Sequence, residues 1–589
     1  MPILKRYQIK IFIFNLLEKC GLKDDRLFFA VTIGVALFCG FTAVAFKKII
    51  EKLFTFFYHT PHFEAWYFYL IIPALGGLLA GLIIHYFTPE ARGSGVPELK
   101  LALYARNGAI SLKTVLGKFF LSALCIGTGH PTGREDPTLY ITGGIASAIA
   151  RFLYFSREKM QTLVQVGATA GFAAAFNTPL AAITFTLEKI VGNFNAKILG
   201  TSVIAAVVAS MVERSFFGNV PLFYVPTYNF STPTELLFCL FLGIVSGVVS
   251  VIFIHGLLYT RMMFRNKLNP RTRPLQPFFG GIIIGLIALI SKNSMGIGYN
   301  IVNQALFSEL AITVLLILLL LKLGGTIISY ASGNAGGILA PTLFIGAMTG
   351  GFMGQLISQT FPAVTADSGT YALIGMGASF AGIIRAPMTS VLLIFEMTHD
   401  YSIIVPLMIT NMMSYAISER FSKTPVYDAL ALQDGIHLPN PNEQEFFKEL
   451  HVGEIMQIDL ITFLYNWPVM RVIKNRELKY SRYPVVDIEG NFIGLVSSND
   501  IQKEYLKKHF HKKLYKITES DPEFRIYPDQ SVEIALRKMG QKGIKTIPVV
   551  DRENSKNLLG IVTASDIFKA YGIKDTNLKM YDDTKMHSK

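Results

Sequence analysis

Long apolar runs alternate with short polar breaks along most of the chain. From about residue 28 to 418 the apolar segments have uneven length, and several, such as those at 160–190 and 370–400, are interrupted by Gly, Pro or Asn. A straight helix needs roughly 20 apolar residues to cross a bilayer, and some segments are too short. Such segments are tolerated at membrane depth only inside protein or beside a cavity. The pattern predicts a polytopic helical membrane domain with broken helices.

The two halves of this region repeat each other. Two pairs of motifs lie 204 residues apart: ALGGLLAGLI (74–83) with FFGGIIIGLI (278–287), and Pro137-Thr138-Leu139 with Pro341-Thr342-Leu343. A third pair, 166–189 with 374–397, lies 208 residues apart and is aligned on Pro179 with Pro387 and on Glu188 with Glu396. Internal repeats with interrupted helices indicate a transporter-like fold, with its binding site where the repeats meet. The repeat alone leaves open whether the halves are inverted.

A more charged region with apolar runs of strand length begins at about residue 430. YPVVDIEGNFIGLVSSNDI (483–501) recurs as IPVVDRENSKNLLGIVTASDI (547–567). Each copy predicts a strand, a turn, a strand and then a helix, which begins with Ser497 and Asp500 or with Thr563 and Asp566 at the spacing of a capping box. We expect a separate soluble α/β module.

Composition supports a membrane protein. Of 589 residues, 51% are hydrophobic and 16% charged, against about 25% charged in soluble proteins, and the mean hydropathy is +0.41. The net charge of +14 could indicate nucleic acid, but it gathers in short loops such as 259–274, which the positive-inside rule makes cytoplasmic, and no aromatic-interleaved basic motif accompanies it. The expected partner is the lipid bilayer, and no nucleic acid is expected.

The N-terminal segment and the cysteines predict little chemistry. Residues 1–27 lack a small-residue cleavage site, so we expect an amphipathic lead-in and not a signal peptide. Its basic residues favour a cytoplasmic N-terminus. The four cysteines are far apart and suggest neither a metal site nor a disulfide framework: Cys20, Cys39, Cys125 and Cys239.

Three Gly-rich breaks, RGSGVPE (92–98), TGREDP (132–137) and GNAGGILAP (333–341), each lie beside a segment that could begin a helix. Helix N-termini carry unpaired N–H groups and roughly half a positive charge, so several together could hold an anion loosely enough to release it. Close helix packing explains any single break, but three in a repeat predict an anion path. The few acids in apolar surroundings form no obvious cation cage: Glu135, Asp136, Glu188 and Glu396.

These motifs, followed by PVYDAL at 425–430, resemble in order the signature motifs of the CLC family of chloride channels and proton/chloride antiporters. The tail resembles a tandem CBS pair. The resemblance implies an all-α membrane domain with inverted repeats, followed by an α/β CBS module, in a homodimer with one pore per subunit. Chloride would be the substrate, no cofactor would be required, and the C-terminus would be cytoplasmic. The expected domains are an N-terminal segment at 1–27, a transmembrane domain at 28–432 (halves about 28–262 and 275–432), a CBS pair at 433–573 (copies about 451–508 and 515–573) and a tail at 574–589.

The resemblance also implies roles for individual residues. Ser94 and Tyr427 match hydroxyl groups that contact the central chloride, and Ser94 favours chloride because proline there is associated with nitrate. Ile338 and Leu339 match residues that offer backbone N–H groups, although the family usually has Phe in place of Leu339. Glu135 matches the gating glutamate, whose carboxylate occupies the outer anion site and swings away when protonated. The expected loop backbone around the anion is that of Gly93, Gly95, Gly133, Arg134, Asp136 and Gly337.

This sequence departs from the family pattern at two positions. Where the family has Gly, Asp136 adds a carboxylate that would repel chloride or make Glu135 easier to protonate. Alternatively it points away and caps a helix start, which we favour. In the proton pathway, Glu188 matches the first acid of a pair, but Lys189 stands where antiporters carry the inner glutamate. Lysine could carry protons if burial made it release one, or could attract anions. We expect channel-like or weakly proton-coupled transport.

Several alternatives remain open. The first is H⁺/Cl⁻ exchange through Lys189 or another route, and the second is a CBS-linked cation transporter or sensor, against which the neutral Gly-rich breaks argue. An enzyme is least expected, because no metal cluster, nucleophile elbow or phosphate-binding loop is present. In the tail, four residues match positions that bind an adenine nucleotide in some CBS pairs, and helix capping explains them equally well: Ser497, Asp500, Thr563 and Asp566.

Overall fold

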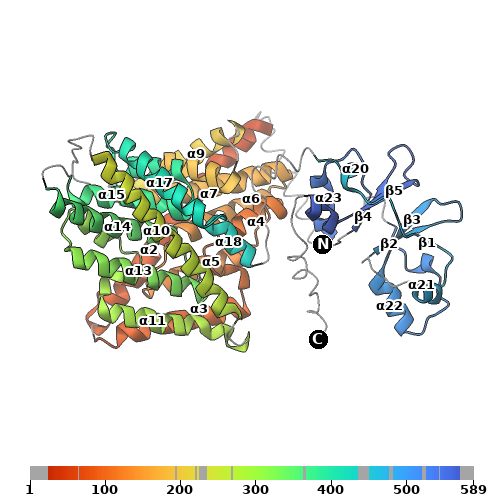
Figure 1. Cartoon of the computed structure of the whole chain (residues 1–589), viewed down its shortest axis with the longest axis horizontal. Coiled ribbons are helices and arrows are strands. Elements are labelled where there is room, and N and C mark those ends of the chain that lie inside the picture. Colours follow the sequence, from red (N-terminus) through yellow and green to blue (C-terminus); the bar gives the residue numbers. More distant parts are fainter. Residues whose placement is uncertain are drawn as a thin grey trace. The chain divides into compact units, whose positions relative to one another are not determined.

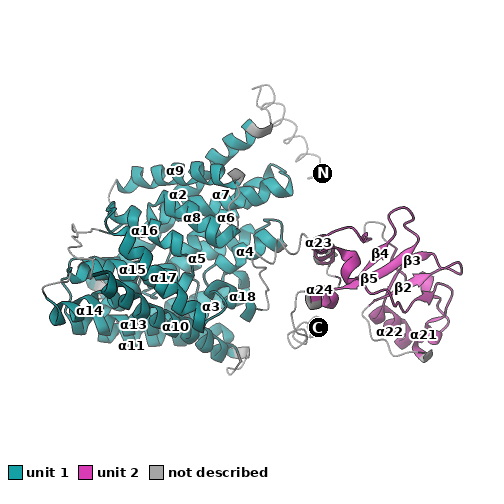
Figure 2. Cartoon of the chain, turned by 45° about the horizontal axis from the view of Figure 1, so that its top comes forward, with its two compact units in different colours: residues 1–438 teal, residues 439–589 magenta. Residues whose placement is uncertain are grey.

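The computed structural model divides into two compact units, residues 1–438 and 439–589 (Figure 2). It describes residues 24–63, 65–192, 196–218, 222–223, 235–266, 270–362, 366–434, 450–475, 482–520, 525–542, 544 and 546–570. Most of the predicted N-terminal segment, Cys20 and the tail at 574–589 lie outside these residues.

The elements of the first unit are all helices in its described residues, and loops connect them (Figure 1). Its first half consists of α2 (Asp24–Tyr58), α3 (Phe68–Tyr86), α4 (Val96–Ala105), α5 (Leu112–Gly127), α6 (Glu135–Phe152), α7 (Arg157–Phe176), α8 (Pro179–Phe185), the π-helical η3 (Thr186–Val191), α9 (Ala196–Phe217) and α10 (Glu235–Asn266). The second half consists of α11 (Gln276–Ile290), α12 (Tyr299–Leu306), α13 (Ile312–Ala331), α14 (Leu339–Thr360), α15 (Ser368–Ile384), α16 (Pro387–Thr398), α17 (Ile404–Phe421) and α18 (Val426–Gln433).

Both long and broken helices occur, as the apolar pattern predicts. Among the described residues, six helices are long and apolar enough to cross a membrane. Others are much shorter: α4, α8 and α12 have ten, seven and eight residues. Proline lies at the start of α4, α8 and α16, where its missing N–H is not needed and its fixed φ suits a helix. Many large apolar side chains remain exposed on the outer helices, which suits a surface that faces lipid.

Helices α3 and α11 show that the repeats are inverted. A Cβ added to Gly77 would lie 2.2 Å from the carbonyl oxygen of Pro277, and one added to Gly281 would lie 2.3 Å from that of Pro73. Later residues of one helix therefore meet earlier residues of the other, so the two helices are antiparallel and lie side by side (Figure 1). Since Pro73 and Gly77 correspond to Pro277 and Gly281 at the 204-residue spacing, equivalent helices run in opposite directions. The expected inverted repeat is confirmed.

The second unit contains two similar strand pairs. The three-stranded sheet has the order β1 (Phe463–Leu464), β2 (Arg482–Val486) and β3 (Phe492–Ser497), and the other sheet pairs β4 (Thr546–Val550) with β5 (Leu558–Thr563). Pro484 pairs with Leu495 and Pro548 with Ile561, and both antiparallel pairs shift register at the same place. The helices are α20 (Val452–Ile455), α21 (Val469–Asn475), α22 (Ser498–Leu506), α23 (Val532–Lys542) and α24 (Ala564–Ala570). The predicted tandem α/β module is confirmed.

Candidate functional site

The three Gly-rich breaks meet in the interior of the helical unit. The loop before α4 joins the loop before α14, because the Gly93 N–H donates to the Asn334 carbonyl and the Gly336 N–H donates to the Gly93 carbonyl, both at 3.1 Å. The loop before α6 joins it as well: Gly133 and Gly337 exchange two N–H to carbonyl bonds of 2.8 Å. Gly133 and Gly337 are 204 residues apart and therefore occupy equivalent positions in the two halves. The pseudo-two-fold axis that relates the halves passes between them.

Glycine is required at the start of α4. Gly93 and Gly95 have φ values of +72° and +99°, a region that other residues rarely adopt. A Cβ at Gly95 would also lie 2.7 Å from the Cβ of Tyr140. The turn therefore holds Ser94 between the two glycines, next to the Gly93 backbone bonds that join the loops.

Asp136 accepts hydrogen bonds from three of the groups expected to hold chloride. Its Oδ2 lies 2.5 Å from the Ile338 nitrogen and 3.3 Å from the Leu339 nitrogen, and the Tyr427 hydroxyl donates to Oδ1 at 2.6 Å. We call these three donors the donor triad. Asp136 is fully buried. Because α14 begins at Leu339, Asp136 does cap a helix start, but the expectation that it points away from the anion-binding residues is wrong. Unpaired N–H groups at a helix start attract the negative charge of a carboxylate.

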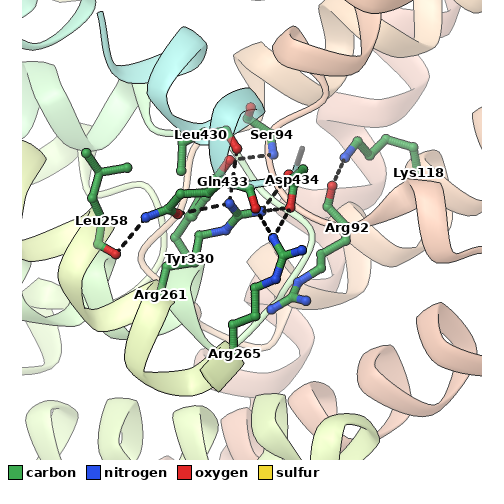
Figure 3. A network of polar contacts seen from close by, with 10 residues as sticks. All are labelled: Arg92, Ser94, Lys118, Leu258, Arg261, Arg265, Tyr330, Leu430, Gln433 and Asp434. Atoms are coloured by element: carbon green, nitrogen blue, oxygen red, sulfur yellow. Dashed lines mark hydrogen bonds and ion pairs between the residues drawn. The ribbon is translucent and has the colours of Figure 1, made fainter. Parts of the chain in front are cut away.

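Ser94 has a buried hydroxyl oxygen without a hydrogen-bond partner in the described part of the chain. Its backbone N–H lies 3.4 Å from the hydroxyl of Tyr330, at the end of α13, and Figure 3 shows the two residues facing each other. Buried polar groups usually have partners, so a hydroxyl of this kind is suited to contact a bound ion. Tyr330 was not predicted from the sequence.

Glu135 has different neighbours from Asp136, although the two residues are adjacent. Its Oε1 accepts a hydrogen bond of 2.5 Å from the hydroxyl of Tyr299, the first residue of α12, and lies 3.7 Å from Nε of Arg134. Its Oε2 has no partner among the described residues. Tyr299 was not predicted, yet a signal existed, because it follows Gly95 by 204 residues and therefore opens the helix equivalent to α4.

Two buried lysines order the loops before α4 and α12. Lys118 donates to the carbonyls of Ala91, Arg92 and Gly93 at 2.8–3.0 Å, whereas Lys322 donates to those of Ser294, Gly296 and Ile297 at 2.6–3.3 Å. Both side chains are fully buried, and they are 204 residues apart. A buried ammonium group needs such partners. Each lysine therefore fixes a loop that leads to a helix of the site.

Two cavities approach the junction. A cavity of about 940 Å³ is lined by Arg134 and Tyr299, the neighbours of Glu135. Another, of about 310 Å³, is lined by Gly93 and Tyr330, the neighbours of Ser94. Both contain more basic than acidic side chains, and a basic lining raises the local concentration of anions. The first contains Lys47, Arg134 and Lys292, and the second Arg92, Arg106, Arg261, Arg265 and Arg273.

A polar network fixes the helix that carries Tyr427 (Figure 3). Arg261, near the end of α10, donates to the Leu430 carbonyl at 3.2 Å, to Oε1 of Gln433 at 3.1 Å and to Asp434 at 2.7 Å. On the other side, Lys100 of α4 lies 2.5 Å from Asp428 of α18. These contacts hold α18, and with it the Tyr427 hydroxyl, against the rest of the site.

Glu188 and Glu396 each cap a helix of the other half. Glu188 accepts from the N–H and the hydroxyl of Thr389 at 2.9 and 2.6 Å, at the start of α16. Glu396 accepts from the N–H groups of Leu180 and Ala181, both at 2.8 Å, at the start of α8. Beside Glu188, Lys189 is half-buried in the π-helical turn η3, and such turns are frequent at functional sites.

In the second unit, the four predicted nucleotide residues take part in helix-start contacts. Ser497 accepts from the N–H of Asn499 at 3.3 Å, and Asp500 pairs with Lys503. Thr563 and Asp566 bond each other reciprocally, with the Thr563 N–H donating to Asp566 at 2.9 Å. A cavity of about 550 Å³ with Arg482, Glu519 and Arg525 in its lining is not lined by any of these four.

Comparisons with known proteins agree with this arrangement. The family model described as voltage gated chloride channel matches residues 76–419, and the CBS domain model matches 452–507 and 517–573. The H(+)/Cl(−) exchange transporter ClcA of Salmonella schwarzengrund (strain CVM19633) is 30% identical over 415 residues, which are 69% of this chain and 87% of that protein.

Two solved structures have the same fold. A slow cyanobacterial Cl⁻/H⁺ antiporter is 26% identical with a TM-score of 0.63, and the match covers 70% of this chain and 98% of the antiporter. A eukaryotic CLC transporter is 20% identical with a TM-score of 0.64, and the match covers 92% of this chain and 98% of the transporter. The second likeness concerns the fold alone.

Proposed function

Because this chain belongs to the voltage-gated chloride channel (CLC) family and carries two CBS domains, we propose that it carries chloride with weak or absent proton coupling. It is an integral membrane protein. The donor triad is the observation that supports an anion as the cargo: two helix-start N–H groups and a phenol converge on one buried point and hold a carboxylate there. Donors without full charge release an anion more easily than a cation would.

In this proposal chloride binds between the loops that meet in the interior. Ser94 offers its buried, unpartnered hydroxyl, Tyr427 a second hydroxyl, and Ile338 and Leu339 their N–H groups. The basic linings of the two cavities concentrate chloride at both approaches. The surrounding backbone is that of Gly93, Gly95, Gly133, Arg134, Asp136 and Gly337.

Glu135 is proposed as the outer gate. Its carboxylate is held by Tyr299, which lines the larger cavity. Protonation removes the negative charge that competes with chloride, so the gate opens more readily in acid.

Weak coupling is proposed from the position next to Glu188. Lys189 replaces the carboxylate that would relay protons, and the Glu188 carboxylate is engaged with Thr389. Proton-coupled exchange is the second candidate, favoured by the relative named as an H(+)/Cl(−) exchange transporter and by two adjacent buried acids, Glu135 and Asp136.

We further propose a homodimer with cytoplasmic termini and a regulatory CBS pair. An adenine nucleotide is the ligand to test on that pair, by the match of Ser497, Asp500, Thr563 and Asp566 to nucleotide-binding positions. Substitutions of these residues must be interpreted with their helix-start contacts in mind.

Reconstitution in liposomes tests the proposal. We expect chloride current whose reversal potential stays near the chloride equilibrium potential and moves little when a pH gradient is imposed. A large shift with the pH gradient would establish exchange instead. No chloride flux in either condition would contradict chloride transport altogether.

A further inference from the structure

The donor triad already contains an anion that belongs to the chain. Oδ2 of Asp136 takes the N–H groups of Ile338 and Leu339, and Oδ1 takes the hydroxyl of Tyr427. Each of these donors has one hydrogen to give. Chloride could therefore use the triad only after the Asp136 carboxylate has left it.

The hydrogen bonds favour a charged carboxylate. Both oxygens of Asp136 accept hydrogen bonds from the donor triad, and the 2.6 Å contact with the Tyr427 hydroxyl has the length of a charge-assisted O–H···O⁻ bond, which is roughly twice as strong as a neutral one. The carboxylate is also tethered to the site, so its effective concentration there is of the order of millimolar or higher. Free chloride competes with it at a disadvantage.

The surrounding backbone accommodates the two acids in an equivalent way. A Cβ at Gly337 would lie 2.3 Å from Oδ2 of Asp136, and a Cβ at Gly133 would lie 2.6 Å from Oε2 of Glu135. Gly133 and Gly337 are the hydrogen-bonded pair on the two-fold relation between the halves. Each acid therefore lies against one glycine of that pair, and both carboxylates lie beside the junction of the loops.

We propose that Asp136 is a second gating carboxylate, an internal anion that fills the donor triad and must leave it before chloride can bind there. This inference rests on the proposed function. Glu135 controls the side that faces Tyr299 and the larger cavity, and Asp136 controls the donor triad. The two acids therefore form gates in series.

The charges near Asp136 determine how its gate responds to pH. Glu135 and Arg134 lie beside it in the chain, Tyr427 donates to it from α18, and Lys118 and Tyr299 interact with it electrostatically from α5 and α12. A proton on Asp136 removes its charge and weakens its hold on the three donors. Chloride should then enter the triad more easily in acid.

Chloride binding to purified full-length protein, measured by calorimetry at neutral and at acidic pH, tests this gate. Asp136→Asn keeps the shape and removes the charge, whereas Asp136→Gly removes the side chain. At neutral pH both should bind chloride at least about tenfold more tightly than wild type, and the difference should shrink in acid. If Asp136→Gly does not purify as a monodisperse protein, the chloride affinity of Asp136→Asn alone tests the inference. Affinities within about twofold of wild type at both pH values would overturn the inference.

Glu135→Gln is the matched variant, because it neutralises the neighbouring acid and leaves the donor triad filled. At neutral pH it should tighten chloride binding less than Asp136→Asn does, because the donor triad stays filled, and only the double variant with Asp136→Asn should lose the pH dependence of binding. Loss of that dependence in Glu135→Gln alone would overturn the second gate.

Chloride flux in liposomes separates this inference from the proposed function. If the wild type transports chloride but the Asp136 variants bind chloride no more tightly than it does, the second gate is disproved while chloride transport is retained. Absence of wild-type flux would remove the proposed function, while tighter binding by Asp136→Gly would still support an anion site closed by its own carboxylate. Absence of chloride binding by every form would overturn both.

Discussion

Glu135 and Asp136 are neighbours in the chain, yet tyrosines from different helices hold them. Successive residues on an α-helix point about 100° apart, so the first two residues of α6 face different parts of the unit. Glu135 meets Tyr299 of α12, and Asp136 meets Tyr427 of α18. Each hydroxyl therefore stabilises one acid, and the two can be perturbed separately.

Replacing Tyr299 by Phe should release Glu135. A hydrogen bond to a charged group is worth about 1.5–3 kcal/mol, so its loss should raise the population with Glu135 displaced about tenfold or more. We expect a faster initial rate of chloride efflux from liposomes at neutral pH. Tyr371→Phe is the control, because the buried hydroxyl of Tyr371 has no partner among the described residues. A rate for Tyr299→Phe no higher than that of the control would show that Tyr299 does not restrain the gate.

At the scale of elements, each half of the helical unit stabilises helices of the other. Glu188 lies on η3 and caps α16, whereas Glu396 lies on α16 and caps α8. Gly133 and Gly337 bond each other in the same reciprocal way. Short helices gain little stability by themselves, so α8 and α16 depend on these contacts between the halves.

Glu188→Gln and Glu396→Gln should each destabilise the protein by about 1–2 kcal/mol, because an amide caps a helix start less well than a carboxylate. Thermal unfolding measures the loss, and amide hydrogen exchange locates it. Exchange should accelerate at the start of α16 in the first variant and at the start of α8 in the second. Glu309→Gln, at an exposed position, is the control. Acceleration confined to the helix that carries the substitution would contradict capping between the halves.

At the scale of the whole molecule, the charge distribution follows the proposed path. The chain has a net charge of +14, and basic side chains line both cavities that approach the site. Such linings act over roughly the Debye length, about 10 Å at 0.1 M salt. Their effect on chloride entry should therefore weaken as ionic strength rises.

Arg273→Gln tests this effect, since Arg273 is exposed and lines the smaller cavity. We expect chloride transport to slow about two- to fivefold at low ionic strength and to approach wild type at high ionic strength. Liposome flux with impermeant salt added to vary ionic strength provides the measurement. Lys423→Gln removes an exposed charge that lines neither cavity and should have little effect. Equal slowing at all salt concentrations would point to a structural role for Arg273.

The sequence predicted the repeat and the meeting of the three Gly-rich loops, because both depend on spacing along the chain. Tyr299 and Lys322 could have been found in the same way, since they stand 204 residues after Gly95 and Lys118. The orientation of the Asp136 side chain could not be predicted in this way, because it depends on a contact with Tyr427, 291 residues away. Which donor a side chain meets is decided by packing between distant segments, and spacing does not encode it.

The pair formed by Gly133 and Gly337 has one more consequence. A chloride path formed only by residues related by this pseudo-two-fold axis would be the same from both ends. Glu135 and Asp136, however, have Leu339 and Ala340 as their counterparts 204 residues later, so these two acids lie in the first half without acidic counterparts in the second. The proposed chloride path is therefore asymmetric: an ion that enters from one end would meet the two acids in the opposite order from an ion that enters from the other end. If both acids gate this path, chloride should cross it more readily in one direction than in the other.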